Sequence, residues 1–331
     1  MSRAGSARYV ALSGGIGGAK LSLGLAHLLG DRLTVVVNTG DDFEHLGLTI
    51  SPDVDTTLYT LGGVVNPETG WGRRDETWSF MQAMTALGGP AWFNLGDRDL
   101  ATHVDRTQRL RSGATLTDIT AHLAGKLGVA ARVLPMADEP VRTVVETDAG
   151  TLAFQEYFVR DQCRPIVRSI RYDGAATARV ASQVMQALTA PNLAGVIICP
   201  SNPWLSIDPV LAVPGMRGAM RASGAPVIAV TPIVGGKALK GPTAKIMAEL
   251  GIAPDARSIA SHYGDLIDGF VLDRQDAQSI DAIPRPATVA NTVMQTLEDK
   301  VALARHCLAF CDRIAQERTS PSELEEAGAR S

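Results

Sequence analysis

A glycine-rich segment near the N-terminus has the composition of a phosphate-binding loop. It reads Ser13-Gly-Gly-Ile-Gly-Gly-Ala-Lys20 and lies between an apolar run and a helical pattern. Glycines at such a turn let backbone N–H groups approach a phosphate, and the helix N-terminus adds partial positive charge. The spacing is neither that of a Walker loop nor that of a complete dinucleotide fingerprint. A tight turn packed for structural reasons is the alternative. The candidate ligand-binding residues in this segment are Gly14, Gly15, Gly17, Gly18 and Lys20.

Carboxylates are concentrated just after the second apolar run. Asn38-Thr-Gly-Asp-Asp42 is followed by Ser51-Pro-Asp-Val-Asp55. Bringing four aspartates together is costly without a cation, and their hard oxygens suit Mg²⁺, which also bridges phosphates. A Rossmann dehydrogenase carries one acidic residue here to hold a ribose, so several acids favour metal-assisted phosphate chemistry. The alternative is that Asp41 and Asp53 only cap helices or turns.

A third polar segment runs from Trp92 to His103. Arg98 and His103 are suited to hold a phosphate or a carboxylate. In the alternative interpretation, Asp97-Arg98-Asp99 is an internal ion-pair network that orders the loop. Trp92 is able to stack on a flat ring, although packing against the core is its more common role.

A fourth segment, Pro200-Ser-Asn-Pro-Trp204, follows a later apolar run. Its prolines stiffen the chain, and Ser201 and Asn202 present a hydroxyl and an amide at the predicted sheet edge. This arrangement suits a nucleotide site. Lys237 and Lys240 are further candidates for phosphate contacts, with solvated surface lysines as the alternative.

The elements expected to position these groups follow an α/β pattern. Residues 9–13 and 33–38 are apolar runs typical of buried parallel strands, and residues 19–29 between them have helical periodicity. Together they predict a right-handed βαβ unit. Further strands are expected at 193–199 and 226–230, each ending in a turn-forming loop. Such loops meet at the sheet edge where doubly wound folds bind ligands.

Residues 76–189 interrupt this alternation. Helices are expected at 115–127 and 175–188, and a hairpin from 141–147 and 151–158 around Asp148-Ala-Gly. We therefore predict the α/β class, with a Rossmann-like doubly wound, mostly parallel sheet and an inserted α+β lid subdomain.

The predicted boundaries follow from these elements. The nucleotide-binding core takes residues 9–75 and 190–315, and the inserted substrate or lid subdomain takes residues 76–189. The last helix is expected near residues 287–314, and residues 316–331 are expected to form a disordered tail because they are polar and terminal.

Charge and hydropathy exclude several classes of protein. With 31 basic and 35 acidic side chains the net charge is -4, which gives no general attraction to nucleic acid or to anionic membranes. No apolar stretch of about 18 or more residues suggests a membrane span. The first residues lack the apolar core of a signal peptide, so we expect a cytoplasmic protein. A homodimer is the default expectation for oligomeric state.

The order of seven short motifs resembles that of one enzyme family. The motifs are Gly14-Gly-Ile-Gly-Gly-Ala-Lys20, Asn38-Thr-Gly-Asp-Asp42, Ser51-Pro-Asp-Val-Asp-Thr56, Leu95-Gly-Asp-Arg-Asp-Leu-Ala-Thr-His103, Leu134-Pro-Met-Ala-Asp138, Phe154-Gln-Glu156 and Pro200-Ser-Asn-Pro203. The set is similar to that of the 2-phospho-L-lactate transferases, which build the deazaflavin coenzyme F-420. The resemblance covers roughly residues 9–275.

The resemblance implies a transfer reaction. Family members move a phosphorylated small acid from its guanosine diphosphate adduct to the ribityl hydroxyl of the deazaflavin Fo, and GMP leaves. The reaction requires Mg²⁺. The acid is phospholactate, phosphoenolpyruvate or phosphoglycerate, and no motif decides among them. A companion guanylyltransferase makes the unstable donor, so hand-over between the two enzymes is expected.

The resemblance also implies roles for individual residues. Asp55 falls where the family holds Fo and would orient or deprotonate the acceptor hydroxyl, with Asp41 as a second catalytic carboxylate. In-line attack by an alcohol needs positioning and charge neutralisation, so no covalent nucleophile is expected. The implied Fo site comprises Asp55, Asn94, Arg98 and His103, the metal site Asp41, Asp42 and Asp53, and the guanosine diphosphate site residues 14–20, Ser201 and Asn202.

Two other kinds of protein remain as alternatives. Sugar-nucleotide-binding regulators of the same superfamily share the glycine loop and the Asn-x-x-Asp/Glu-Asp segment but bind without transfer. Leu95-Gly-Asp-Arg-Asp99 and Ser51-Pro-Asp-Val-Asp55 fit the transferases better. An NAD(P)-dependent oxidoreductase is supported by the glycine loop alone.

Overall fold

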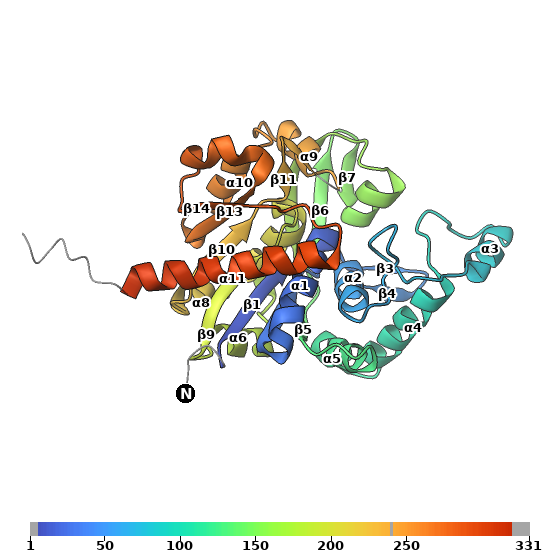
Figure 1. Ribbon diagram of the computed structural model, residues 1–331. Coiled ribbons are helices and arrows are strands. Elements are labelled where there is room, and N and C mark those ends of the chain that lie inside the picture. The colour runs from blue at the N-terminus through green and yellow to red at the C-terminus, as the bar shows by residue number, and fades with distance from the viewer. Residues whose placement is uncertain (1–5, 239–240, 320–331) are drawn as a thin grey trace, which may run out of the picture.

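A seven-stranded parallel sheet forms the centre of the molecule (Figure 1). The computed structural model describes residues 6–238 and 241–319. The strand order is β14-β13-β10-β9-β1-β2-β5, and every neighbouring pair is parallel. The strands are β1 (Arg8–Ser13), β2 (Leu33–Val37), β5 (Arg132–Pro135), β9 (Leu193–Ile198), β10 (Val227–Val230), β13 (Gly269–Asp273) and β14 (Ala287–Ala290).

Helices cover both faces of this sheet, so its strands are buried on both sides. Successive residues of a strand point to opposite faces, and in β1 Val10 belongs to one hydrophobic cluster while Ala11 belongs to the other. One face is covered by α1 (Gly15–Leu29), α2 (Pro52–Leu61), α5 (Leu116–Lys126) and α11 (Leu297–Thr319). The other is covered by α6 (Ser182–Leu188), α7 (Asp208–Ala212), α8 (Met216–Ala222), α9 (Thr243–Glu249) and α10 (Ala256–Tyr263).

The sheet is doubly wound, which confirms the predicted fold class. From β1 the chain passes to β2 and then to β5 on one side, whereas β9, β10, β13 and β14 extend the sheet on the other side. The direction of winding therefore changes between β1 and β9. In open α/β sheets, ligands bind at the carboxyl ends of the strands beside such a switch point. The glycine loop after β1 and Ser201 after β9 both lie there.

Two small groups of elements are attached to the sheet. Between β2 and β5 lie the hairpin β3 (Phe43–His45) and β4 (Leu48–Ile50), then α3 (Ser79–Ala86) and α4 (Asp97–Arg111). A three-stranded antiparallel sheet has the order β7-β6-β8, and a short hairpin joins β11 and β12. These strands are β6 (Arg142–Thr147), β7 (Gly150–Ala153), β8 (Val167–Asp173), β11 (Ile233–Val234) and β12 (Lys237–Ala238).

Several local predictions are confirmed. Strands β6 and β7 pair as the expected hairpin, and α5 occupies the helix expected at 115–127. The second strand is shorter than the expected 151–158, because β7 ends at Ala153 and Glu156–Arg160 form a π-helix. The helix expected at 175–188 is a 3₁₀ turn at Ala175–Thr177 followed by α6.

Three expected boundaries differ from the structure. Strand β5 falls within residues 76–189, yet it pairs with β2 as the edge of the central sheet, because Val133 and Leu134 are apolar enough to be buried there. The helix expected near 287–314 is divided: Ala287–Ala290 is strand β14, and α11 begins at Leu297. Helix α11 then continues to Thr319, past the start of the expected tail, and residues 320–331 lie outside the described residues.

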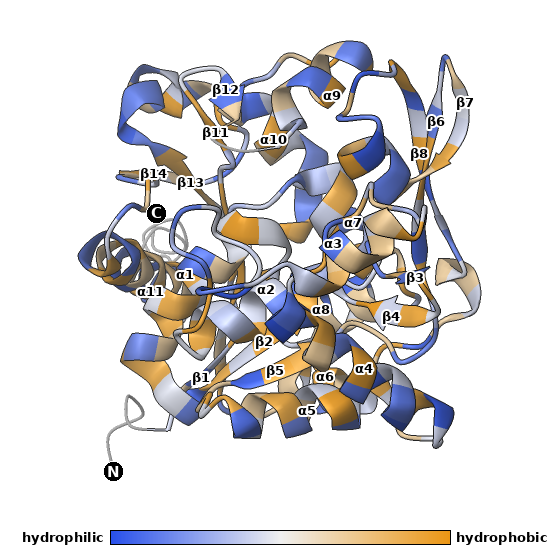
Figure 2. Ribbon diagram, turned by 90° about the vertical axis from the view of Figure 1, so that its right-hand side faces the viewer, coloured by the Kyte–Doolittle hydropathy of each residue, from blue (hydrophilic) through white to orange (hydrophobic). Residues whose placement is uncertain are grey.

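Helix α11 starts where its sequence provides a cap. The Asp299 N–H donates to Thr296 Oγ1 at 3.2 Å, and the Thr296 N–H donates to Asp299 Oδ2 at 2.9 Å. This reciprocal pair satisfies N–H groups at the helix start and fixes where α11 begins. Helices such as α4 and α5 carry both hydrophobic and hydrophilic residues (Figure 2). None of the helices in residues 6–238 and 241–319 is long and apolar enough to cross a membrane.

Candidate functional site

The glycine loop is in direct contact with the loop after β9. The Ser201 hydroxyl donates to the Gly14 carbonyl at 2.8 Å, and the Gly14 N–H donates to Ser201 Oγ at 3.3 Å. Helix α1 starts at Gly15, so the backbone N–H groups of its first turn point toward the carboxyl edge of the sheet. The structure thus brings together Ser201 and the glycines, as the sequence predicts.

Three of these glycines leave no room for a side chain. A Cβ atom on Gly17 would lie 2.2 Å from the Pro200 carbonyl oxygen, and one on Gly18 would lie 2.5 Å from Ser13 Oγ. A Cβ atom on Gly14 would lie 2.4 Å from Ser206 Cβ. The glycines therefore have a packing role, as in the structural alternative. Phosphate binding by the same loop stays a prediction that this packing permits.

Most of the polar groups assigned to the guanosine diphosphate site form hydrogen bonds within the protein. Lys20 Nζ donates to the Met294 carbonyl at 2.9 Å. Asn202 Oδ1 accepts from the N–H groups of Trp204 at 3.0 Å and Leu205 at 3.1 Å, which caps the short π-helix η5 (Pro203–Ile207). The Asn202 Nδ2 group is buried without a hydrogen-bond partner. Lys237 is exposed on β12, and Lys240 lies outside the described residues.

Three aspartates lie close to the glycine loop. Asp41 and Asp42 follow β2, and Asp53 lies in the first turn of α2. Asp53 Oδ1 accepts from the Gly15 N–H at 2.8 Å, and Asp53 Oδ2 accepts from Asn38 Nδ2 at 2.9 Å. Asp42 Oδ2 accepts from the Ser51 hydroxyl at 2.7 Å. The Oδ1 atoms of Asp41 and Asp42 are buried and have no hydrogen-bond partner. The two free oxygens are the groups here that most need a cation.

Burial raises the pKa values of these carboxyl groups. Burial, with the neighbouring Asp53 charge, raises the pKa of Asp41 well above its usual range. Burial raises the pKa of Asp42 to about 7, although the Ser51 hydrogen bond opposes the shift. Burial also raises the pKa of Asp53, opposed by its hydrogen bonds to Asn38 and Gly15. A bound divalent cation would reverse these shifts by favouring the ionised forms.

Asp55 lies in a different environment from Asp53, although both are in the first turn of α2. Residues two apart on a helix differ by about 200° in direction, so their side chains diverge. Asp53 contacts α1, whereas Asp55 contacts Arg106 on α4 through both guanidinium Nη atoms, with an Nη1–Oδ2 distance of 3.1 Å. Arg106 is fully buried. This arrangement is compatible with the implied roles, in which Asp41, Asp42 and Asp53 form the metal site and Asp55 belongs to the Fo site; both roles stay predictions.

His103 is buried beside this ion pair. His103 Nδ1 is 3.3 Å from Arg106 Nη1 and 3.7 Å from Asp55 Oδ2, and His103 Nε2 is 3.5 Å from Asp99 Oδ2. The Tyr59 hydroxyl donates to Asp99 Oδ1 at 2.5 Å. Asp55, Asp99 and His103 are close enough to ligate one metal ion. However, Arg106 already neutralises Asp55 and would repel a cation at this position.

The remaining residues of the implied Fo site lie near the start of α4. Asn94 and Arg98 are exposed. Asp97 caps α3 by accepting from the N–H groups of Ser79 at 3.1 Å and Phe80 at 3.0 Å. The Asp97-Arg98-Asp99 ion-pair network, which was the alternative interpretation, is not formed, because Asp97 faces α3 and Asp99 faces Tyr59 and His103. The exposed Arg98 side chain is therefore available to a ligand.

A cavity of about 330 Å³ adjoins the aspartate group. It lies at the carboxyl ends of β2 and β5, next to the β3–β4 hairpin and α4. Its lining includes Thr39, Asp42, Thr49, Thr107, Arg111 and Arg142. The cavity therefore offers both hydrogen-bond donors and acceptors beside Asp42.

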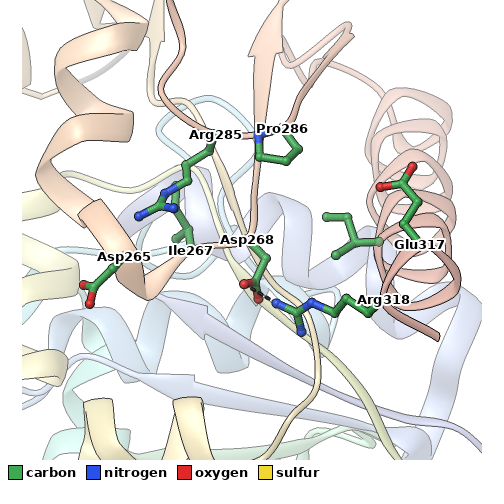
Figure 3. A pocket seen from close by; sticks show the side chains of 8 residues that line it. Asp265, Ile267, Asp268, Arg285, Pro286, Glu317 and Arg318 are labelled. Carbon is green, nitrogen blue, oxygen red and sulfur yellow. Dashed lines mark ion pairs between the residues drawn. The ribbon is translucent and has the colours of Figure 1, made fainter. Parts of the chain in front are cut away.

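A second cavity, of about 350 Å³, lies at the opposite edge of the sheet (Figure 3). Asp265, Ile267 and Asp268 precede β13, and Arg285 and Pro286 precede β14, so this cavity is at the amino ends of the strands. Arg318 and Asp268, which both line this cavity, form an ion pair with each other. Because this cavity lies at the edge of the sheet opposite to the glycine loop, it is not part of the candidate site.

Two residues without an assigned role connect the site. Asn38 Nδ2 donates to Asp53 and, at 3.2 Å, to the Leu205 carbonyl, so it links α2 to the loop after β9. Arg106 links Asp55 to α4. The sequence feature that could have identified Arg106 as a site residue is its position three residues after His103, because residues three apart lie on the same face of a helix. The signal for Asn38 is its place directly after a buried strand.

Comparison with known proteins agrees with the motif pattern. Residues 9–302 match the family described as 2-phospho-L-lactate transferase CofD. The chain is 42% identical over 318 residues to a phosphoenolpyruvate transferase of Kitasatospora aureofaciens, which covers 93% of this chain and 98% of that protein. It is 37% identical over 308 residues to a phosphoenolpyruvate transferase of Mycobacterium avium, covering 83% of this chain and 91% of the relative.

A solved structure shares the fold. A UPF0052 family protein from Bacillus halodurans has a TM-score of 0.61 and 15% sequence identity, and the match covers 91% of this chain and 99% of that one. At this identity the likeness concerns the architecture alone. It agrees with the Rossmann-like sheet described above.

Proposed function

The chain belongs to the 2-phospho-L-lactate transferase CofD family, and on this premise we propose the reaction that it catalyses. The chain transfers phosphoenolpyruvate from its guanosine diphosphate adduct to the ribityl hydroxyl of Fo, and GMP leaves. The observation that carries this proposal is the group of buried carboxylates beside the glycine loop, which suits metal-assisted transfer from a diphosphate. Phosphoenolpyruvate is chosen because the compared relatives are named phosphoenolpyruvate transferases.

The donor's diphosphate would lie at the N-terminus of α1. The first turn of this helix offers backbone N–H groups and a partial positive charge, and glycine at three positions keeps side chains away. The Ser201 hydroxyl and the unpartnered Asn202 Nδ2 come from the neighbouring loop. We place the guanosine part on that side, with Lys20 as an additional positive charge near the loop.

Mg²⁺ fits the aspartate group. Asp41 and Asp42 each present one buried carboxylate oxygen without a partner, which is the hard ligand that Mg²⁺ prefers. Asp53 is the weaker ligand candidate, because both of its oxygens already accept hydrogen bonds. When bound, Mg²⁺ would neutralise the charge of the diphosphate and of the leaving GMP.

The acceptor hydroxyl would approach from the side of Asp55. Arg106 holds both Asp55 oxygens, so Asp55 is better suited to accept a hydrogen bond and orient the hydroxyl than to remove its proton. Asp41 is the other catalytic candidate. Asn94 and Arg98, which are exposed at the start of α4, would contact Fo, and His103 would support Asp55 from its buried position.

The proposed assembly and location follow the family. We propose a cytoplasmic homodimer that receives the unstable donor from a companion guanylyltransferase. Both substrates are small molecules, and neither nucleic acid nor membrane is proposed as a partner.

The reaction is tested by product analysis. The protein is mixed with Mg²⁺, Fo and the guanosine diphosphate adduct of enolpyruvate, lactate or glycerate in separate reactions, so that one phosphate of the adduct is transferred with the acid and the other leaves in GMP. We expect equimolar release of GMP and a phosphoenolpyruvyl product of Fo, identified by mass spectrometry, with the enolpyruvate adduct preferred. Replacing Asp55 by Asn should lower turnover about 100-fold or more.

One control and two outcomes define what would contradict the proposal. Circular dichroism must show that Asp55→Asn is folded, because the variant leaves the Arg106 charge without its partner. Near-normal turnover by the folded variant would contradict the role of Asp55. A stable complex with a nucleotide and no release of GMP from any adduct would favour the sugar-nucleotide-binding regulator.

A further inference from the structure

A closed loop between α2 and α3 presents a tryptophan. We call residues 65–73 the Trp71 loop. The Asn66 N–H donates to the Gly72 carbonyl at 3.0 Å, and the Gly70 N–H donates to the Asn66 carbonyl at 2.9 Å. An antiparallel bridge between the first and last residues closes the loop. Trp71 lies between Gly70 and Gly72, whose φ angles of 78° and 67° are in the left-handed region.

The Trp71 loop contacts the glycine loop. A Cβ atom on Gly70 would come within 2.9 Å of Ile16 Cγ2. Ile16 lies between Gly15 and Gly17 in the first turn of α1. Because the next Cα atom along a chain is only about 3.8 Å away, the Trp71 side chain starts beside the N-terminus of α1.

The backbone of Trp71 is fixed, although its side chain is exposed. Thr69 Oγ1 donates to the Trp71 carbonyl at 2.7 Å and accepts from the Trp71 N–H at 3.4 Å. The exposed fraction of Trp71 is 49%, the largest among the tryptophans of the described residues. Binding residues are often placed on ordered loops, and this exposed indole lies on a loop that contacts the N-terminus of α1.

The base of the Trp71 loop is attached to the acceptor side of the site. The N–H groups of Val64 and Val65 donate to the Tyr59 carbonyl at 2.9 and 3.0 Å. The Arg73 guanidinium lies 5.5 Å from the centre of the Tyr59 ring. Tyr59 in turn contacts Asp99, which faces His103. The loop therefore spans the glycine loop and the Asp55–Arg106 region.

We propose that Trp71 forms a stacking surface for the planar heteroaromatic ring of a substrate. This inference rests on the proposed function. The donor carries guanine and the acceptor carries a deazaflavin, and both have the fused flat ring that stacks on indole. A ring bound there would cover the exposed indole face and would orient the substrate relative to the N-terminus of α1.

The test measures the two ligands separately. Equilibrium titration calorimetry of the full-length protein gives dissociation constants for GDP with Mg²⁺ and for Fo. Trp71→Ala is compared with Trp71→Phe and with Trp78→Ala, a matched control that removes another exposed tryptophan, 37% exposed, just before α3. We expect Trp71→Ala to raise the dissociation constant of one of the two ligands about 5- to 100-fold. Trp71→Phe should restore most of that affinity, and Trp78→Ala should leave both constants unchanged.

The outcome also identifies the ring. A loss confined to GDP assigns the surface to guanine, and a loss confined to Fo assigns it to the deazaflavin. If the wild type binds both ligands and Trp71→Ala binds them equally well, the stacking inference is wrong while the proposed function stands. If the wild type binds neither ligand, the proposed function is wrong and the inference falls with it. Unchanged circular dichroism of Trp71→Ala separates stacking from a folding defect.

Discussion

Asp42 combines three properties that rarely occur together in one carboxyl group. It is buried, one of its oxygens has no hydrogen-bond partner, and it lines a cavity. Burial raises its pKa to about 7, so without a metal it is largely protonated in weakly acidic solution. The folded protein then binds this proton more tightly than the unfolded chain. Its stability should therefore fall as the pH rises toward and through 7.

The prediction for Asp42 concerns the metal-free protein between about pH 5.5 and 8, because the contribution of this group is lost as the pH rises through its raised pKa of about 7. The free energy of unfolding should fall with pH, by at most about 1.4 kcal/mol per pH unit for one proton. Burial lowers the pKa values of His45 and His306. These histidines make the free energy of unfolding rise with pH below the usual histidine pKa of about 6.5, equally in the wild type and in an Asp42 variant. Asp42→Asn should make the slope smaller, while Asp41, whose pKa burial also raises, should keep part of it. The variant should be more stable than the wild type at pH 8. Urea unfolding at each pH measures this.

An exposed carboxyl group provides the control for Asp42. Asp31→Asn should leave the pH slope unchanged, because Asp31 is exposed. Adding Mg²⁺ at pH 8 should stabilise the wild type more than Asp42→Asn, since the variant lacks one ligand oxygen charge. A pH slope that is identical in the wild type and in Asp42→Asn would contradict the assigned burial of this carboxyl group.

Residue types and spacing predicted which side chains would lie close together, but not which hydrogen-bond or ion-pair partner each of them would have. The glycine loop, Ser201 and the aspartates after β2 meet at the sheet edge, as expected from strand-end loops. The resemblance assigns Asp53 and Asp55 to different sites, and their spacing on one helix agrees with this, but the partner of each side chain could not be predicted, because it depends on which helix each one meets. Arg106 had no assigned role for the same reason, since its partner lies 51 positions away in the chain.

At the scale of elements, the close approach of α1 to the loop after β9 positions the site. Gly17 contacts the Pro200 carbonyl so closely that no side chain fits. Gly125 in α5 is also helical, but a Cβ atom there would meet nothing within 4 Å. The two glycines therefore separate the effect of packing from that of helix propensity.

Replacing each of these glycines by alanine should have opposite effects. Gly125→Ala should stabilise the protein by about 0.5–1 kcal/mol, because alanine restricts the unfolded chain and favours helix. Gly17→Ala should destabilise it by about 1–3 kcal/mol, because α1 must move away from Pro200. Urea unfolding gives both values. Equal stabilisation by the two substitutions would show that α1 and the loop after β9 do not make the described contact.

The predictability of elements depended on their length and on local signals. Long periodic segments such as α5, and the hairpin of β6 and β7, are determined by nearby residues and were predicted. Strands β5 and β14 have only four residues each, and they are strands because β2 and β13 lie beside them. Such pairing is a tertiary effect that a four-residue pattern does not reveal.

At the scale of the whole molecule, loops from distant parts of the chain form one site. The loops after β1, β2 and β9 surround the proposed diphosphate position. A ligand that contacts all three should oppose unfolding of the entire sheet, since it binds only when the three strands are paired. This property links ligand binding to global stability.

Thermal unfolding should therefore respond to GDP with Mg²⁺. At a free concentration 100 times the dissociation constant, the ligand should add about 2.7 kcal/mol and raise the Tm by several degrees. NAD⁺ should produce no shift, because the loop lacks a complete dinucleotide fingerprint. Differential scanning calorimetry measures each. A shift with NAD⁺ and none with GDP would favour the oxidoreductase alternative.

The position of α11 has a consequence for protein synthesis. A Cβ atom on Gly24 of α1 would lie 2.1 Å from the Lys300 carbonyl oxygen, so the two helices touch through their backbones. Helix α1 (Gly15–Leu29) is translated well before α11 (Leu297–Thr319). Until α11 has been translated, the apolar face of α1, with Leu21 and Leu25, lacks this cover. The nascent chain should therefore depend on chaperones until α11 has emerged.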